Sequence, residues 1–109
     1  MEDKTVNILG TEYKVVIDES LEKTEFDGLH NTYSKQVSVR KVDDMLADEP
    51  DIEQKQRRFE EVMRHEVMHA FFIESGLTDY CLNEQLVDWF AIQSPKIFKV
   101  FKELGVIKD

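Results

Sequence analysis

The sequence predicts an α+β fold, in which a small N-terminal sheet packs on a central helix and two further helices follow. Three observations support this class. Short apolar segments separated by turn-forming residues occupy residues 6–42, and a three- and four-residue apolar spacing occupies residues 51–75. A second helical pattern begins after residue 83. At 109 residues the chain has room for one hydrophobic core, so we expect a single domain over residues 1–109.

The first strands are expected near the N-terminus. Residues 6–9 and 12–17 cluster or alternate apolar side chains on either side of Gly10-Thr11, a pattern typical of a β-hairpin. The polar stretch over residues 18–27 gives only a weak signal, for a loop or a helical turn. The sequence therefore predicts one hairpin followed by an irregular connection.

A second pair of strands is expected before the central helix. Residues 29–33 and 36–42 could pair across a short turn, with Val37 and Val39 facing the core. A third or edge strand would then lie close before the helix in the chain. We therefore expect a small antiparallel or mixed sheet in the N-terminal half.

Residues 51–75 are expected to form the central helix. Pro50 near its start and Gly76 just after its end are typical of helix boundaries. Glu66 lies in the middle of one apolar face, whose other members are Phe59, Val62, Met63, Ala70 and Ile73. Further apolar residues near its end predict a helix buried nearly all round: Val67, Met68, Phe71 and Phe72. A buried carboxylate is unfavourable unless a positive charge compensates it, so Glu66 indicates a nearby cation.

Residues 65–69 have the sequence His-Glu-Val-Met-His within this helix. Four residues span about one turn, so His65 and His69 lie on one face and can bind the same metal ion. Zn²⁺ binds neutral imidazole nitrogens, and Glu66 lies where a general base for a zinc-bound water is found in such motifs. We therefore predict a zinc-dependent hydrolase, although spacing alone does not separate Zn²⁺ from other first-row ions.

A third metal ligand is expected on the next helix. Asn83 is a suitable N-cap, and Glu84 and Asp88 share a face one turn apart. The short connection makes the two helices antiparallel and brings this face close to His69. We assign Glu84 as the third ligand and Asp88 as the acceptor for an imidazole N–H, although either carboxylate could take either role. Three protein ligands would leave a coordination position open, as in catalytic zinc sites.

The C-terminal segment predicts a separate short helix. Ser94-Pro95 suits an N-cap followed by the first helical residue. An apolar face precedes Gly105 and consists of Ile97, Phe98, Phe101 and Leu104. We expect this helix to close the core, or alternatively to dock a partner.

Two groups of residues on the predicted helices resemble a known family. They are the string His65-Glu66-Val67-Met68-His69-Ala70 and the residues Glu84, Val87, Asp88, Phe90 and Ala91. They are similar to the ImmA/IrrE-type zincin-like metallopeptidases and the small metallopeptidase-like proteins of Gram-positive prophages, most strongly over residues 59–94. The resemblance implies a zincin-like fold, zinc as cofactor, and hydrolysis of an intracellular protein or peptide, for instance a regulator. It also implies the same roles for the ligands and for Glu66.

Other polar residues are weaker candidates for a role in the site. His30, Tyr33 or Tyr80 could stabilise the oxyanion of a tetrahedral intermediate, and Tyr80 is nearest to the motif in sequence. For each of them an ordinary strand or loop residue is the favoured interpretation. The single cysteine, Cys81, could be a further ligand, but a small and partly buried residue is the favoured interpretation.

Composition narrows the class of partner. The formal net charge of −9 is dispersed along the chain, which disfavours binding to nucleic acid. The sequence shows no signal peptide and no apolar run of membrane-spanning length, and one cysteine fits a reducing compartment. We therefore expect a cytoplasmic protein, and the resemblance, not the composition, implies that its substrate is a peptide or protein. The alternative is a zinc-containing regulatory or interaction protein of phage type, without catalysis.

Overall fold

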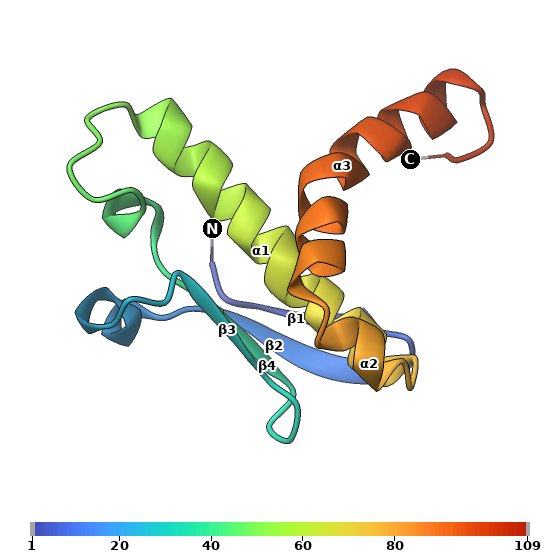
Figure 1. Ribbon diagram of the computed structural model, residues 1–109, viewed down its shortest axis with the longest axis horizontal. Coiled ribbons are helices and arrows are strands. Elements are labelled where there is room, and N and C mark those ends of the chain that lie inside the picture. Colours follow the sequence, from blue (N-terminus) through green and yellow to red (C-terminus); the bar gives the residue numbers. More distant parts are fainter. Residues whose placement is uncertain (1, 109) are drawn as a thin grey trace.

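The computed structural model describes residues 2–108 and confirms the α+β class. Four strands come first: β1 (Lys4–Ile8), β2 (Thr11–Ile17), β3 (Gly28–Asn31) and β4 (Gln36–Val39). Two short 3₁₀ helices, η1 (Glu19–Lys23) and η2 (Val42–Asp44), flank the second strand pair. The helices follow: α1 (Ile52–Glu74), α2 (Thr78–Cys81) and α3 (Glu84–Glu103). The main helices α1 and α3 pack together, and α1 lies across the sheet (Figure 1).

The sheet is mixed and has the order β1-β2-β4-β3. The β1–β2 and β3–β4 pairs are antiparallel, as predicted, and β2 and β4 are parallel. In the first turn Leu9 and Gly10 both have positive φ, 51° and 94°, which is the backbone of a two-residue type I′ turn. Thr11 therefore begins β2 and does not belong to the turn. The order places β3 at an edge of the sheet, with one side free of strand partners among residues 2–108.

The second hairpin is shorter than predicted. The Asn31 side chain accepts hydrogen bonds from the backbone N–H groups of Tyr33 and Ser34, both at 3.0 Å, so the turn begins at Asn31. Tyr33 is 98% exposed and belongs to the turn, not to the strand. After Val39 the chain leaves the sheet toward η2, so the predicted extension of β4 to residue 42 is wrong.

The polar connection between β2 and β3 is ordered around one arginine. Arg40 donates from Nη2 to the backbone carbonyls of Leu21, Thr24 and Phe26, at distances between 2.6 and 3.0 Å. Leu21 is 3% exposed and anchors η1 in the interior. This connection therefore enters β3 in a fixed position beside α1.

The predicted bounds of the central helix are confirmed. The Asp51 side chain accepts a hydrogen bond from the Glu53 N–H, and Gly76 follows the helix with φ of 76°. Its buried residues are Phe59, Val62, Glu66, His69 and Ala70. The prediction of a helix buried nearly all round is wrong, because Val67, Met68, Phe71 and Phe72 are only half-buried, although Val67 and Phe71 pack against the core.

The prediction of a separate C-terminal helix is also wrong, because α3 continues through Pro95. Proline has no N–H, so the carbonyl of Ala91 one turn earlier loses its helical donor. The Arg64 guanidinium of α1 donates to that carbonyl instead. This contact lets the helix continue, and α3 changes direction along its length (Figure 1).

The far part of α3 does not close the core, contrary to the prediction. Phe98, Phe101 and Leu104 are 50%, 41% and 68% exposed. The expectation that this segment docks a partner stays a prediction. No helix of residues 2–108 combines the length and apolarity that crossing a bilayer requires.

Candidate metal centre

The predicted site residues come together at one end of the α1–α3 pair. His65, Glu66 and His69 come from α1, and Glu84 comes from the first turn of α3. Asn83 caps α3, because its side chain accepts a hydrogen bond from the Leu86 N–H at 3.0 Å. The short helix α2 lies in the connection, where the sequence predicted only a loop, and leaves α1 and α3 in contact. The position of each residue on its helix, and the Asn83 cap that starts α3, therefore determine from which helix face each side chain points to the site.

Three donor groups converge on one point. The Nε2 atoms of His65 and His69 lie 3.1 Å apart. The Glu84 carboxylate lies 3.1 Å from each of them, through Oε2 to His65 and through Oε1 to His69. Ligand atoms at about 2.0–2.1 Å from a tetrahedral ion lie about 3.3 Å from one another, so these groups have a spacing at which they could hold one metal ion.

Each imidazole is held from its other nitrogen by a different group. His65 Nδ1 lies 2.8 Å from the Asp88 carboxylate, and His69 Nδ1 lies 3.4 Å from the Cys81 sulfur. A carboxylate only accepts hydrogen bonds, so His65 can donate from Nδ1 to Asp88, and its Nε2 lone pair is then available to a metal ion held between it and Glu84. The structure thus brings Glu84 to the two Nε2 atoms and Asp88 to the back of one ring. This is the arrangement that metal-binding histidines usually have.

The protonation of His69 suits a metal ligand. Its pKa is lowered, first because the ring is buried and second because His30 adjoins it. A neutral imidazole keeps one lone pair for a metal. Burial also raises the pKa of the Cys81 thiol, and the charges of Glu84 and Glu66 raise it further. Cys81 is therefore a neutral thiol behind the ring.

Glu66 lies beside this ligand set and has a partner of its own. It is 7% exposed, and its Oε1 atom lies 3.1 Å from Nδ1 of His30 on β3. A carboxylate oxygen of Glu66 lies within 4.8 Å of ring nitrogens of His65 and His69. One water molecule spans such a distance, so Glu66 can act on a water at the site without being a ligand.

His30, which the sequence offered only as a possible oxyanion stabiliser with an ordinary strand residue as the favoured interpretation, is brought to the site. Its ring stacks on that of His69, with centroids 4.3 Å apart and an interplanar angle of 15°. All three histidines of the chain therefore meet here. The available signal was that so few histidines occur and that one lies on the strand expected beside α1.

Tyr80 is not brought to the site. It is 52% exposed, and its ring lies 6.2 Å from that of Phe72. In the described part of the chain no hydrogen bond joins its hydroxyl to the histidines or Glu66. The arrangement thus offers a metal-ligand set, a separate buried carboxylate and a histidine beside it. A scan against protein-family models and searches of curated proteins and solved structures gave no match to this chain.

Proposed function

We propose that this protein is a zinc-dependent metallopeptidase, of the kind that its helix motif resembles. The observation that carries the proposal is the mutual 3.1 Å spacing of His65 Nε2, His69 Nε2 and the Glu84 carboxylate. Lone-pair donors that converge in this way repel one another unless a cation or protons lie between them. The donor set of two imidazoles and one carboxylate is that of several catalytic zinc sites.

The chain supplies the groups that peptide hydrolysis requires. When bound, zinc would polarise a substrate carbonyl and lower the pKa of water at the coordination position that the protein leaves free. Glu66 can accept a proton from a water between it and the imidazoles, and can then deliver that proton to the leaving amine. His30 contacts Glu66 while its ring stacks on that of His69, and this contact holds the carboxylate in place.

An extended peptide is the substrate class that the surroundings of the site favour. Strand β3 carries His30 and lies at the edge of the sheet. The backbone of an edge strand can pair with an extended peptide, which would then pass along Glu66 and the ligand set. Asp88 and Glu84 have side chains that are 58% and 64% exposed, so the site is open to solvent on the α3 side.

The alternative is a zinc-containing protein without catalysis, whose metal would have a fourth protein ligand. Asp88 is a candidate, because ligand atoms of His65, Glu84 and Asp88 lie within 4.8 Å of one another, but Asp88 contacts Nδ1 of His65 and not the Nε2 atom that Glu84 contacts. A second group, His30, His69 and Cys81, has ligand atoms within 4.8 Å of one another and would use the other side of the His69 ring. The geometry favours the site of His65, His69 and Glu84 with one coordination position open. The metal content of variants at Glu84 and Cys81 distinguishes this site from the group of His30, His69 and Cys81.

The first test is the zinc content of the purified chain, measured by mass spectrometry for wild type and four variants. We expect about one zinc per chain in wild type, as a three-ligand site requires. His65→Ala and Glu84→Ala should lose it. Asp88→Asn should retain zinc with an affinity about 10- to 100-fold lower, because it only orients His65. Zinc that survives Glu84→Ala but not Cys81→Ser would assign the metal to the other group and contradict the proposal.

Hydrolysis is tested next, with zinc-loaded protein and a mixed peptide library analysed by mass spectrometry. Cleavage that stops on chelation and returns with zinc is the expected result. Full zinc occupancy without any cleavage would instead support the non-catalytic alternative.

A further inference from the structure

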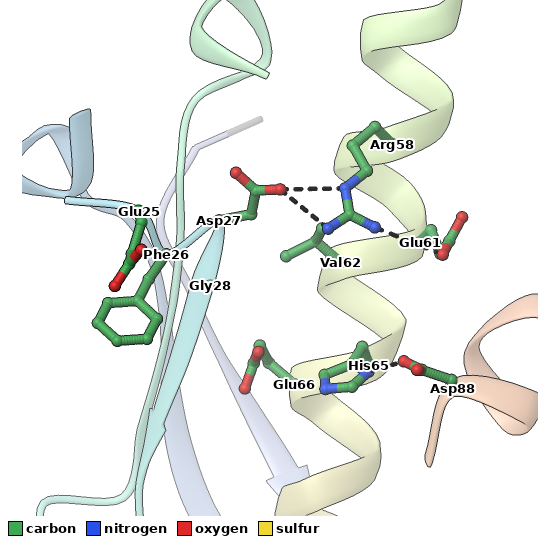
Figure 2. Close-up of a pocket in the computed structure, with 10 residues that line it drawn as sticks. All are labelled: Glu25, Phe26, Asp27, Gly28, Arg58, Glu61, Val62, His65, Glu66 and Asp88. Atoms are coloured by element: carbon green, nitrogen blue, oxygen red, sulfur yellow. Dashed lines mark hydrogen bonds and ion pairs between the residues drawn. The ribbon is translucent and has the colours of Figure 1, made fainter. Parts of the chain in front are cut away.

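A cavity of about 200 Å³ opens directly beside Glu66 and His65. One wall is the segment over residues 25–28, which leads into β3, and the other wall is the face of α1 one to two turns before the motif (Figure 2). The ion pair between Asp27 and Arg58, with an oxygen-to-nitrogen distance of 2.9 Å, crosses between the two walls. A side chain of a substrate bound at Glu66 could enter this cavity.

Part of the cavity wall is apolar. Val62 is 4% exposed and points from α1 toward Gly28, and the Phe26 side chain on the other wall is 52% exposed (Figure 2). Gly28 has no side chain, and a Cβ there would lie 2.7 Å from Cγ1 of Val62. Position 28 therefore leaves the wall smooth and lets β3 approach α1 closely. Such walls suit the aliphatic stem of a long side chain.

Most of the remaining lining is acidic, and internal ion pairs neutralise it only in part. Four carboxylates line the cavity besides Glu66: Glu25, Asp27, Glu61 and Asp88. Two arginines compensate them, since Arg58 pairs with Asp27 and with Glu61, and Arg40 pairs with Asp27 at 3.6 Å. These four carboxylates and two guanidinium groups together carry a net charge of −2, with Glu66 not counted. A bound Zn²⁺ would not change this, because its charge is matched by Glu66 and Glu84.

We propose that this cavity receives a lysine or arginine side chain of the substrate, next to the bond that is cleaved. The proposal rests on the peptidase function above and adds a preference for a basic residue. The aliphatic stem lies along Val62, and the cationic end meets the acidic lining, to which Glu61 contributes from α1 and Glu25 from the opposite wall (Figure 2). An acidic substrate side chain is disfavoured, because Arg58, the one cationic side chain among the described residues that line the cavity, is already paired with two carboxylates.

The test measures binding apart from catalysis. Three acetylated and amidated pentapeptides carry arginine, norleucine or glutamate between pairs of alanines, and they are titrated into the ¹⁵N-labelled full chain, with chelator and then with zinc. We expect the arginine peptide to shift the amide signals of Phe26, Gly28 and Glu61. The norleucine peptide, with a similar stem and no charge, should bind about tenfold more weakly, as two exposed ion pairs would allow. The glutamate peptide should bind more weakly still.

Two variants at neighbouring positions test whether the preference for the arginine peptide arises in this cavity. Glu61→Gln should reduce the preference for arginine over norleucine about threefold, which is the size of one exposed ion pair. Glu60→Gln is the control, since Glu60 lies next to it on α1, is exposed and does not line the cavity. Equal affinity for the arginine and norleucine peptides, or no shift at these residues, would overturn the proposal whether or not the protein is a peptidase. Conversely, cleavage of the peptide library without a preference for basic residues would overturn the cavity's role and leave the peptidase function standing.

Discussion

Glu66 and Glu74 lie on the same helix, eight residues apart, and both side chains reach the sheet. Glu74 accepts three hydrogen bonds, from the Thr11 hydroxyl at 2.6 Å, the Tyr13 hydroxyl at 2.6 Å and the Lys35 ammonium at 2.9 Å. These contacts lower its pKa to about 2. Glu66, although it is 7% exposed, has one such contact in the described part of the chain, with His30 at 3.1 Å.

The difference separates a structural carboxylate from one that is available for chemistry. The oxygens of Glu74 are engaged by neighbours, so it links the end of α1 to β2 and to the turn before β4. It also stabilises the protonated form of Tyr13, whose pKa is raised chiefly by burial and further by the hydrogen bond to Glu74. Glu66 keeps acceptor capacity beside the ligand set, as a general base requires. Burial alone would not have told the two apart.

Replacing each carboxylate by its amide gives the largest expected contrast. Glu66→Gln should lower hydrolysis by at least about 100-fold, because the amide cannot accept the proton, while zinc content and stability stay near wild type. Glu74→Gln should retain zinc and hydrolysis but lower the thermal unfolding midpoint by several degrees. Both are measured by library cleavage, zinc content and calorimetry. An active Glu66→Gln protein would remove Glu66 from the mechanism.

A methyl group at position 28 should disturb Glu66 without changing its chemistry. The added Cβ of Gly28→Ala would lie 2.7 Å from Val62 Cγ1 and 2.9 Å from Glu66 Cγ, so either β3 or α1 must move. We expect a loss of about 1–3 kcal/mol in the free energy of unfolding, with a lower kcat. Leu29→Ala, at a 42% exposed position on the same strand, is the control and should change kcat little. An unchanged kcat in Gly28→Ala would show that the position of Glu66 is not critical.

The contribution of Glu74 to the free energy of unfolding should depend on pH, whereas that of the amide in Glu74→Gln should not. The pKa of Glu74 is lowered from an ordinary value of 4.5 to about 2 in the folded protein, so the carboxylate stabilises the fold fully above about pH 4.5. This contribution is lost progressively as the pH falls from about 4.5 to about 2. The difference in unfolding free energy between wild type and Glu74→Gln, measured with urea between pH 2 and pH 6, should therefore shrink toward low pH. A constant difference would show that the shifted pKa is not what stabilises the fold.

The sequence by itself determined the local features, because their causes are local. Asp51 and Gly76 set the ends of α1, and Asn83 sets the start of α3, through contacts within a few residues. The positions of His65 and His69 on one helix face follow from helix geometry, and in the structure their Nε2 atoms lie 3.1 Å apart. The approach of Glu84 to both rings was predicted from the short connection, and the structure has it.

Only the tertiary structure decided the features that depend on distant segments. His30 meets Glu66 across 36 positions of sequence, and Glu74 meets Tyr13 across 61, and no local pattern encodes either contact. Pro95 predicted the start of a separate helix. In the structure Arg64 donates a hydrogen bond to the Ala91 carbonyl, which has no partner from the proline nitrogen, and α3 continues. A sequence shows which groups a residue carries, whereas packing decides which of those groups are already satisfied. That is why the motif predicted a catalytic role for Glu66, while the contrast with Glu74 emerged only from the fold.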